Sequence, residues 1–356
     1  MAPFRILSLD GGGIRGLIPA LVLAELEQRT GKRTAQLFDL IAGTSTGGIL
    51  ALGLTRPGAA GKPLYGADEM VGLYEKDGSK IFDRSPLHRL KAIGNLADEK
   101  YPSHGIDAVL KARFGESMLS EAITPVLVTS YDIEERGPYF FKSHRARLEP
   151  PRNHLMRDAA RATSAAPTYF EPVKVPCSDQ KSGYRALIDG GVYANNPAAC
   201  ALVEAMCFFD QKLDDIVMLS LGTGENTRPI KYEDAKGWGL AKWAQPVLNV
   251  VFDGVSDTVH YQLQSLLTKG AQSGRYLRVQ VDLTDANDDM DDASERNLRD
   301  LKVVAEKLIA ENDAALDALA AHLTGAIPSR PRAAIPAMPS IATGGNGGAT
   351  VQPPPA

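Results

Sequence analysis

Short apolar runs of strand-like composition alternate with longer stretches of helical periodicity along most of the chain. The short runs predict strands at Phe4–Leu9, Leu37–Ala42, Pro125–Tyr131, Tyr139–Lys142, Tyr184–Ile188, Ile216–Leu221 and Tyr276–Val281. The periodic stretches predict helices from about Ile14 to Arg29, from Thr46 to about Leu54, and at Asn153–Arg161, Pro197–Phe209, Trp243–Leu267 and Glu295–His322. Strands that alternate with helices are typical of α/β proteins, so we expect a three-layer α/β/α fold with a largely parallel central sheet.

The same alternation divides the chain into three parts. We expect one α/β domain over residues 4–225, followed by a helical and strand extension packed on it over residues 226–323. Residues 324–356 contain seven prolines and five glycines with almost no large apolar side chain. Such a segment cannot bury enough surface to offset its ordering entropy, so we expect a disordered tail.

Composition and charge exclude several classes of protein. The 356 residues are 44% hydrophobic and 23% charged, the balance of a soluble globular protein, and the net charge of −4 argues against a nucleic-acid partner. No run approaches the roughly 18 apolar residues that span a bilayer, and the N-terminal residues lack the features of a secretory signal. Three cysteines without zinc-ligand spacing favour a reducing compartment, so we expect a cytoplasmic protein.

A glycine-rich segment, Gly11–Gly16, follows the first strand and precedes the first helix. It fits the dinucleotide fingerprint G-x-G-x-x-G, but Thr34–Gln36 stands where a ribose-binding acid is needed. Consecutive glycines let backbone N–H groups point into one cavity, where they can hold a phosphate or a transient oxyanion. A tight turn without further role is the simpler interpretation.

The segment Gly43–Gly47 has the sequence G-T-S-T-G and again lies between a strand and a helix. This is the pattern of a nucleophile elbow, in which small residues on either side of a strained serine let the strand and helix pack closely. Ser45 is therefore the candidate nucleophile. Otherwise it is a structural serine of a turn.

A serine nucleophile needs a base. Six histidines follow Ser45, and none of them has a glycine-flanked position at the end of a predicted strand: His88, His104, His144, His154, His260 and His322. Asp189 directly follows the strand Tyr184–Ile188 and is followed by Gly190 and Gly191, so its carboxylate is expected at the edge of the sheet where α/β sites lie. An aspartate at such a place is as readily a turn former.

Three motifs now stand in order along the chain: Asp10–Gly16 (DGGGIRG), Gly43–Gly47 (GTSTG) and Asp189–Gly191 (DGG). Together they resemble the patatin-like phospholipase family, bacterial type, which uses a serine–aspartate dyad. Ala162–Phe170 and Val192–Pro197 resemble the family too, and the resemblance covers about residues 4–225.

The resemblance implies a lipid acyl hydrolase, of phospholipase A or lysophospholipase type, that works through an acyl-enzyme without metal or cofactor. It makes Ser45 the nucleophile and Asp189 the proton acceptor. It assigns the oxyanion hole to Gly11, Gly12, Gly13 and Arg15, and the remaining motif positions are Gly16, Gly43, Gly47, Gly190 and Gly191. For Arg15 an ion pair with Asp10 or another acid is the alternative.

Lipid substrates require contact with a membrane surface, which we expect to be transient. The tryptophans of Gly237–Trp243 are candidates for it, whereas the run from Trp243 to Val255 has helical spacing and is expected to pack on the core. The loop Arg56–Gly66 is rich in glycine and proline and is predicted to move as a lid beside Ser45. The acidic run Asp285–Glu295 departs from a calcium loop at Met290 and is expected to be a solvated loop.

Three alternatives remain beside the lipid hydrolase. They are a latent, ligand-activated phospholipase effector of bacterial defence, a catalytically silent lipid-binding module, and a nucleotide-binding oxidoreductase that uses Gly11–Gly16. The sequence leaves head-group choice, position on the glycerol, regulation and oligomeric state open.

Overall fold

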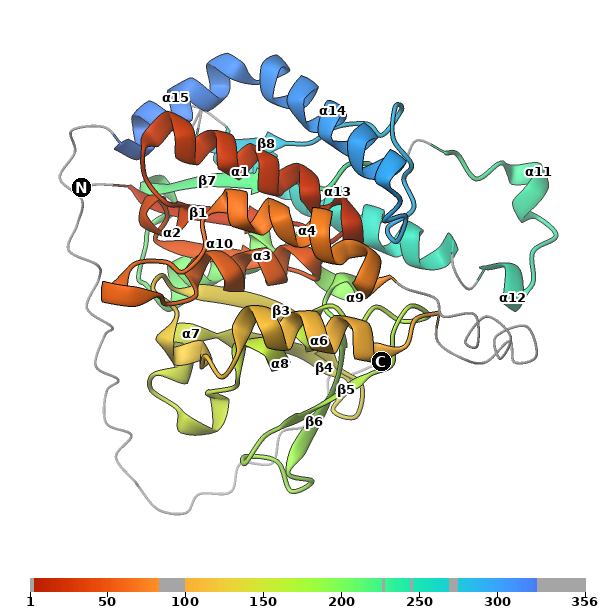
Figure 1. The fold of residues 1–356 in the computed structure, drawn as a ribbon, viewed down its shortest axis with the longest axis horizontal. Coiled ribbons are helices and arrows are strands. Elements are labelled where there is room, and N and C mark those ends of the chain that lie inside the picture. The colour runs from red at the N-terminus through yellow and green to blue at the C-terminus, as the bar shows by residue number, and fades with distance from the viewer. Residues whose placement is uncertain (1–2, 83–99, 226–227, 244–245, 269–274, 325–356) are drawn as a thin grey trace, which may run out of the picture.

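The computed structural model describes residues 3–82, 100–225, 228–243, 246–268 and 275–324, and the chain forms one central sheet between two layers of helices (Figure 1). The sheet contains eight strands in these residues, in the order β5-β6-β3-β2-β1-β7-β8, with β4 paired to β3. The strands are β1 (Phe4–Leu9), β2 (Leu40–Gly43), β3 (Val126–Asp132), β4 (Gly137–Lys142), β5 (Val173–Pro176), β6 (Tyr184–Asp189), β7 (Ile216–Leu221) and β8 (Tyr276–Val279).

The larger helices divide between the two faces of the sheet. One face is covered by α1 (Leu17–Thr30), α3 (Thr46–Thr55), α4 (Ala67–Ile81), α6 (Ser103–Phe114), α8 (Met156–Thr163), α14 (Glu295–Glu311) and α15 (Asp313–Thr324). The other is covered by α10 (Ala198–Cys207) and the second half of α13 (Pro246–Leu267). Along β1, Leu7 and Leu9 face the first layer and Ile6 the second, as the two-residue period of a strand requires. The expected three-layer α/β/α fold is confirmed.

The smaller elements lie mainly in the connections. They are α2 (Thr34–Leu37), α7 (Ser143–Ala146), α9 (Gly191–Ala194), α11 (Tyr232–Ala235) and α12 (Leu240–Trp243), with 3-10 turns at Gly13–Gly16, Ala59–Gly61, Leu119–Glu121, Pro150–Arg152 and Leu213–Asp215.

The sheet is parallel in one part and antiparallel in the other. Strands β3, β2, β1, β7 and β8 run parallel, whereas β4 and β6 are antiparallel to β3, and β5 is antiparallel to β6. Strand β4 pairs with β3 from Leu127 to Asp132, so β2 and β6 must share the other edge of β3. There β2 ends opposite Val128 and β6 ends opposite Ser130, so that their carboxyl ends meet head to head.

The structure also differs from the expected elements in several places. Helices α4 and α6 and strand β5 were not predicted. The single helix expected over Glu295–His322 is two helices, because the chain leaves helical geometry at Asn312. Of the expected tail, only Thr324 lies within the described residues, as the last residue of α15. No helix in the described ranges has the length and apolar character of a membrane span.

Candidate active site

Ser45 occupies the turn between β2 and α3 with φ 54° and ψ −124°, a conformation that non-glycine residues rarely adopt. Close backbone packing holds it there. A Cβ added to Gly43 would lie 2.2 Å from the Gly47 carbonyl oxygen, and one added to Gly47 would lie 2.2 Å from the Leu9 carbonyl oxygen. The Ser45 N–H donates to Thr163 Oγ1 at 2.8 Å. The turn therefore has the strained geometry of a nucleophile elbow.

Asp189 ends β6, and its side chain is completely buried. Oδ1 accepts a hydrogen bond from the Gly191 N–H at 2.7 Å, while Oδ2 has no hydrogen-bond partner of good geometry among the described residues. Burial raises the pKa of the Asp189 carboxyl to about 7, although interactions with the Ser45 hydroxyl and the Gly191 N–H lower it. A carboxylate with this pKa accepts a proton from serine more readily than an exposed one.

The glycine nest lies against Ser45, because a Cβ added to Gly11 would be 3.2 Å from the Ser45 Cβ. Two hydrogen bonds orient its peptide groups. The Gly11 carbonyl accepts from Thr223 Oγ1 at 2.7 Å, and the Gly12 carbonyl accepts from Arg15 Nε at 3.3 Å. Since C=O and N–H point in opposite directions across a trans peptide, the N–H groups of Gly12 and Gly13 point away from these partners.

The three glycines are not equivalent as hydrogen-bond donors. The Gly11 N–H donates to the Asn195 carbonyl at 3.1 Å, and so it is already bonded within the protein. The N–H groups of Gly12 and Gly13 have no acceptor in the described part of the chain. These two groups, rather than three, are left for an oxyanion.

Arg15 is buried, and burial lowers its pKa, against the opposing effects of Asp253, Tyr169 and Asp289. The alternative pairing with Asp10 is wrong for the described structure, because Asp10 Oδ2 accepts from Arg278 Nη2 at 2.6 Å instead. Arg15 donates to the Gly12 carbonyl, so it lies on the side of this peptide opposite the Gly13 N–H and helps to hold its orientation.

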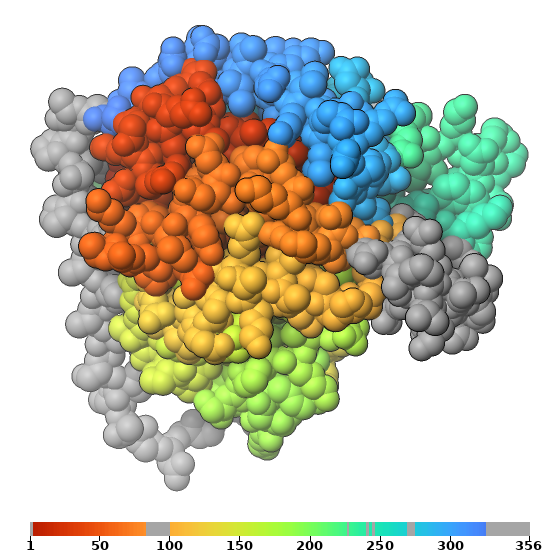
Figure 2. All heavy atoms as spheres, viewed as in Figure 1, coloured from red at the N-terminus to blue at the C-terminus, as the bar shows by residue number. Residues whose placement is uncertain are grey.

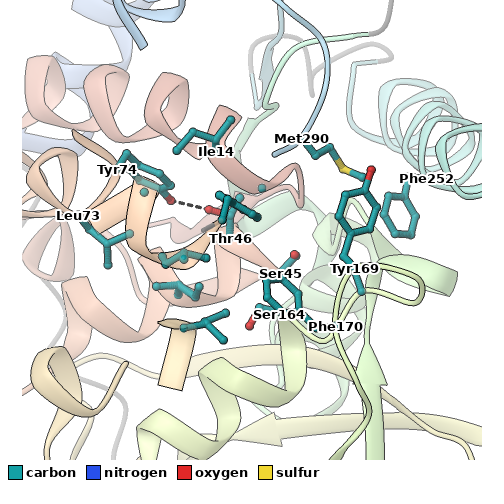
Figure 3. A pocket seen from close by; sticks show the side chains of 17 residues that line it. Ile14, Ser45, Thr46, Leu73, Tyr74, Ser164, Tyr169, Phe170, Phe252 and Met290 are labelled. Carbon is teal, nitrogen blue, oxygen red and sulfur yellow. Dashed lines mark hydrogen bonds between the residues drawn. The ribbon is translucent and has the colours of Figure 1, made fainter. Parts of the chain in front are cut away.

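An apolar pocket that opens to the surface adjoins Ser45 (Figure 3). Leu73 and Tyr74 of α4 form one side, and Tyr169, Phe252 and Met290 gather on the opposite side. It is lined by Gly13, Ile14, Ser45, Thr46, Ile49, Leu73, Tyr74, Gly78, Ile81, Phe82, Ile106, Ser164, Ala166, Tyr169, Phe170, Phe252 and Met290. Its main polar pair, Thr46 and Tyr74, is satisfied by a mutual hydroxyl hydrogen bond of 2.6 Å. Such a lining suits an alkyl chain.

The loop Asp285–Glu295 has a different role from the solvated loop that was expected. Met290 is buried against the pocket, and its carbonyl accepts from the Ile14 N–H at 2.8 Å. This part of the acidic run is thus a wall of the site.

The predicted lid is wrong. Arg56–Gly66 begins after the last residue of α3, whereas Ser45 precedes the first, and ten helical residues separate them by about 15 Å. Arg56 is held by Ser117 Oγ at 3.0 Å and by Tyr65 Oη at 3.2 Å. None of the loop lines the pocket.

The described histidines do not line the pocket with Ser45. His144 bonds to Glu204, His154 to Tyr139 and His260 to Tyr276, while His88 lies outside the described residues. No group of three or more His, Cys, Asp or Glu side chains in the described ranges is arranged to hold a metal ion.

The sequence interpretation missed residues that support the site. Thr163 lies within the motif-like stretch Ala162–Phe170, but nothing marked it as the partner of the Ser45 N–H. Thr223 stands between two glycines directly after β7, a strand-end signal like that of Asp189, and could have been found in this way.

A strained serine, a buried carboxyl group, two backbone N–H groups without an acceptor among the described residues and an apolar pocket are the arrangement that acyl transfer to and from a serine requires. The fold and site thus have the features of a serine acyl hydrolase.

Comparisons with known proteins agree with this class. The family model of patatin-like phospholipases matches residues 7–202. The chain is 34% identical to Patatin-like protein 4 of Arabidopsis thaliana over 335 residues, 86% of this chain and 83% of that protein. It is 32% identical to Patatin-like protein 2 of Oryza sativa subsp. indica over 349 residues, 89% and 86% of the two chains. The crystal structure of VipD from Legionella pneumophila aligns at 11% identity and a TM-score of 0.41, covering 86% of this chain and 67% of that one.

The chain belongs to the patatin-like phospholipase family, a family of lipid acyl hydrolases. The resemblance inferred from the three motifs is confirmed. Membership also favours a hydrolase over the oxidoreductase interpretation of Gly11–Gly16.

Proposed function

We propose that this protein hydrolyses acyl ester bonds of glycerolipids, as a phospholipase A or lysophospholipase, through Ser45 and Asp189. One observation carries the proposal. The hydroxyl of Ser45, in a strained elbow at the side of an apolar pocket, interacts with the carboxyl group of Asp189, which is completely buried.

In the first step Asp189 Oδ2 accepts the Ser45 hydroxyl proton as Oγ attacks the ester carbonyl carbon. The developing oxyanion accepts hydrogen bonds from the N–H groups of Gly12 and Gly13, with Gly11 excluded by its bond to Asn195. Asp189 then gives the proton to the leaving alkoxide, and the acyl group stays on Ser45. Water then attacks the acyl carbonyl carbon as Asp189 accepts its proton, and Asp189 returns that proton to Ser45 Oγ as the bond to the acyl group breaks and the fatty acid leaves.

The apolar pocket supports a lipid substrate in particular. An acyl chain placed there removes its methylenes from water, which stabilises the complex by about 0.8 kcal/mol for each buried methylene. Met290, Phe252 and Tyr169 contribute the aromatic and flexible side chains that adapt to such a chain.

The test is fatty acid release from mixed phospholipid vesicles by wild type, Ser45→Ala and Asp189→Asn, without added metal. We expect release by wild type and at least a roughly 10³-fold loss in each variant, because the two groups act as a unit. Release that survives Ser45→Ala contradicts the proposal. A serine-directed phosphonate that labels wild type but not Ser45→Ala checks the nucleophile independently of the lipid.

A further inference from the structure

Residues 228–243 and 246–250, which we call the arm, project from the body of the protein. They comprise α11, α12 and the first turn of α13, and they extend beyond the edge of the sheet at which β1 ends (Figure 1). Figure 2 shows the arm as a separate ridge on that side of the molecule.

Both ends of the arm are attached to walls of the Ser45 pocket. At its start, the Arg228 guanidinium binds Asn287 Oδ1 at 3.0 Å and Asp289 Oδ1 at 3.1 Å, in the loop that leads to Met290. At its end, α13 continues to Phe252, which lines the pocket opposite Leu73. The arm therefore begins and ends at segments that line the Ser45 pocket.

The arm exposes large hydrophobic side chains. Four of the ten such side chains among the described residues belong to it: Ile230 (41% exposed), Tyr232 (77%), Val247 (42%) and Val250 (49%). The expectation that Val247 and Val250 pack on the core is therefore wrong, whereas the next residues of the helix, Val251 and Phe252, do pack there. A concentration of this kind marks an interaction surface.

The two tryptophans of the chain, Trp238 and Trp243, also lie in the arm. Their rings contact edge to face with centroids 5.2 Å apart, and both are half-buried. Tryptophan and tyrosine are the side chains that favour the level of lipid head groups, because they combine an apolar ring with a polar group.

The charge of the arm differs in sign from that of the whole chain. The arm contains four cations, Arg228, Lys231, Lys236 and Lys242, and two acids, Glu233 and Asp234, which gives 4 − 2 = +2 against −4 for the protein. Of the four cations, Arg228 is paired with Asp288 and Asp289 outside the arm, and Lys236 with Glu233. Anionic lipid attracts lysines near its surface. Apolar, aromatic and cationic side chains thus occur together at one place beside the pocket.

We propose that the arm is the surface by which this protein docks on anionic lipid, so that an acyl chain can pass from the bilayer into the Ser45 pocket. The proposal rests on the proposed function for the fate of the lipid, but docking itself can be measured without catalysis. A second copy of the chain as the occupant is an outcome that the experiment distinguishes.

The first experiment uses the tryptophans as probes, because all tryptophan emission comes from the arm. Ser45→Ala full-length protein is mixed with phosphatidylcholine–phosphatidylglycerol vesicles, which it cannot consume. We expect a blue shift on binding, quenching by lipids brominated in the acyl chain, and weaker binding at high salt. Absence of vesicle binding, or binding without a change in emission, overturns the proposal. So does an equal shift without vesicles that grows with protein concentration, because it assigns the surface to self-association.

The second experiment compares two exposed tyrosines. Tyr232→Ser changes the arm, and Tyr261→Ser changes a residue of α13 that is 70% exposed but about 16 Å further along the helix than Val250. We expect Tyr232→Ser to lower hydrolysis of the anionic vesicles about fivefold to tenfold, within the range for an apolar side chain that loses its burial. Hydrolysis of a short-chain, water-soluble ester should stay unchanged in both variants, and Tyr261→Ser should match wild type on vesicles. Equal behaviour of the two variants on vesicles overturns the arm as the docking surface. Wild type that hydrolyses neither substrate contradicts the proposed function, while the emission experiment still decides docking.

Discussion

The elbow around Ser45 and the arm are neighbours that differ in how they are held. Close backbone packing and the hydrogen bond of the Ser45 N–H hold the elbow in place, and Asp189 is completely buried. The arm has short helices and exposed apolar side chains, and it is joined to the body through Arg228 and through α13. Catalysis by the proposed site requires groups that are oriented before the substrate binds. Docking by the proposed arm requires apolar side chains that stay exposed to water until lipid covers them.

The largest effect should come from Asp189→Asn, which leaves the shape of the elbow and removes its base. We expect activity to fall about 10⁴-fold on vesicles and on a soluble ester alike, the scale of losing an essential acid–base partner. An arm variant should affect vesicles only, so the ratio of the two activities separates the regions. If Asp189→Asn lost activity on vesicles but not on the soluble ester, the distinction between the elbow and the arm would be wrong.

The same substitution should stabilise the fold. Because the folded pKa of about 7 lies above the usual 3.8, ionised Asp189 destabilises the protein, and stability falls as pH rises between these two values. At pH 8 we expect Asp189→Asn to increase the free energy of unfolding by up to about 4 kcal/mol, and at pH 4 to change it little. Denaturant unfolding at the two pH values measures this difference.

The next effect tests the orientation of the nest. Thr223→Val keeps the shape of the side chain but removes the hydroxyl that binds the Gly11 carbonyl, so the Gly12 N–H loses its fixed direction. We expect kcat to fall about 10-fold to 100-fold with KM little changed, less than the loss of a whole oxyanion donor.

The matched control is Thr55→Val, another buried threonine that donates to a backbone carbonyl, at the end of α3 remote from Ser45. If the two valine variants lower kcat equally, the Thr223 effect is one of general stability and the orienting role is wrong.

The pH dependence should follow the elbow and not the arm. Asp189 must be ionised to accept the Ser45 proton, so activity should decrease about tenfold per pH unit below its pKa of about 7 and level off above it. Tyr232→Ser should leave this midpoint unchanged. A midpoint near 4 for kcat/KM on the soluble ester would contradict the role of burial.

The smallest effect concerns the length of the acyl chain. A Cβ on Gly78 of α4 would point at the pocket, 2.7 Å from Ile14 Cδ1. Gly78→Leu should therefore favour shorter chains, by about fourfold in kcat/KM for each methylene that no longer fits. Gly72→Leu, on the same helix where an added Cβ meets nothing within 4 Å, is the control. If Gly78→Leu and Gly72→Leu show the same dependence of kcat/KM on acyl-chain length, the pocket wall at Gly78 does not select chain length.

The sequence predicted those parts of the site that depend on local geometry. The glycines around Ser45 and after Asp189 mark turns at strand ends whatever the rest of the fold does, so both residues could be located. The direction of β6 could not be predicted, because a strand reads alike in parallel and antiparallel pairing. The walls at Met290 and α4 were missed for a related reason: their side chains acquire a common cavity only through tertiary contacts.

The lid is the instructive error. Glycine and proline in Arg56–Gly66 indicate a loop, which is there, but the loop is near Ser45 only in sequence. The helix between them carries the chain away from the site. Conversely, the arm lies far from Ser45 in sequence and beside its pocket in space.

Because β2 and β6 meet head to head along one edge of β3, their pairing with β3 sets the spacing of Ser45 and Asp189, the proposed catalytic pair. Only Thr129 separates Val128, opposite the end of β2, from Ser130, opposite the end of β6. A slip of β6 by two residues would carry the carboxylate about 7 Å away, and a slip by one would turn it to the other face of the sheet. Gly190 packs so closely against Thr129 that an added Cβ would lie 2.2 Å from the Thr129 hydroxyl oxygen. This contact therefore depends on the observed register of β6. A chain in which β6 has not yet paired with β3 therefore lacks the arrangement of Ser45 and Asp189 on which the proposed hydrolysis depends.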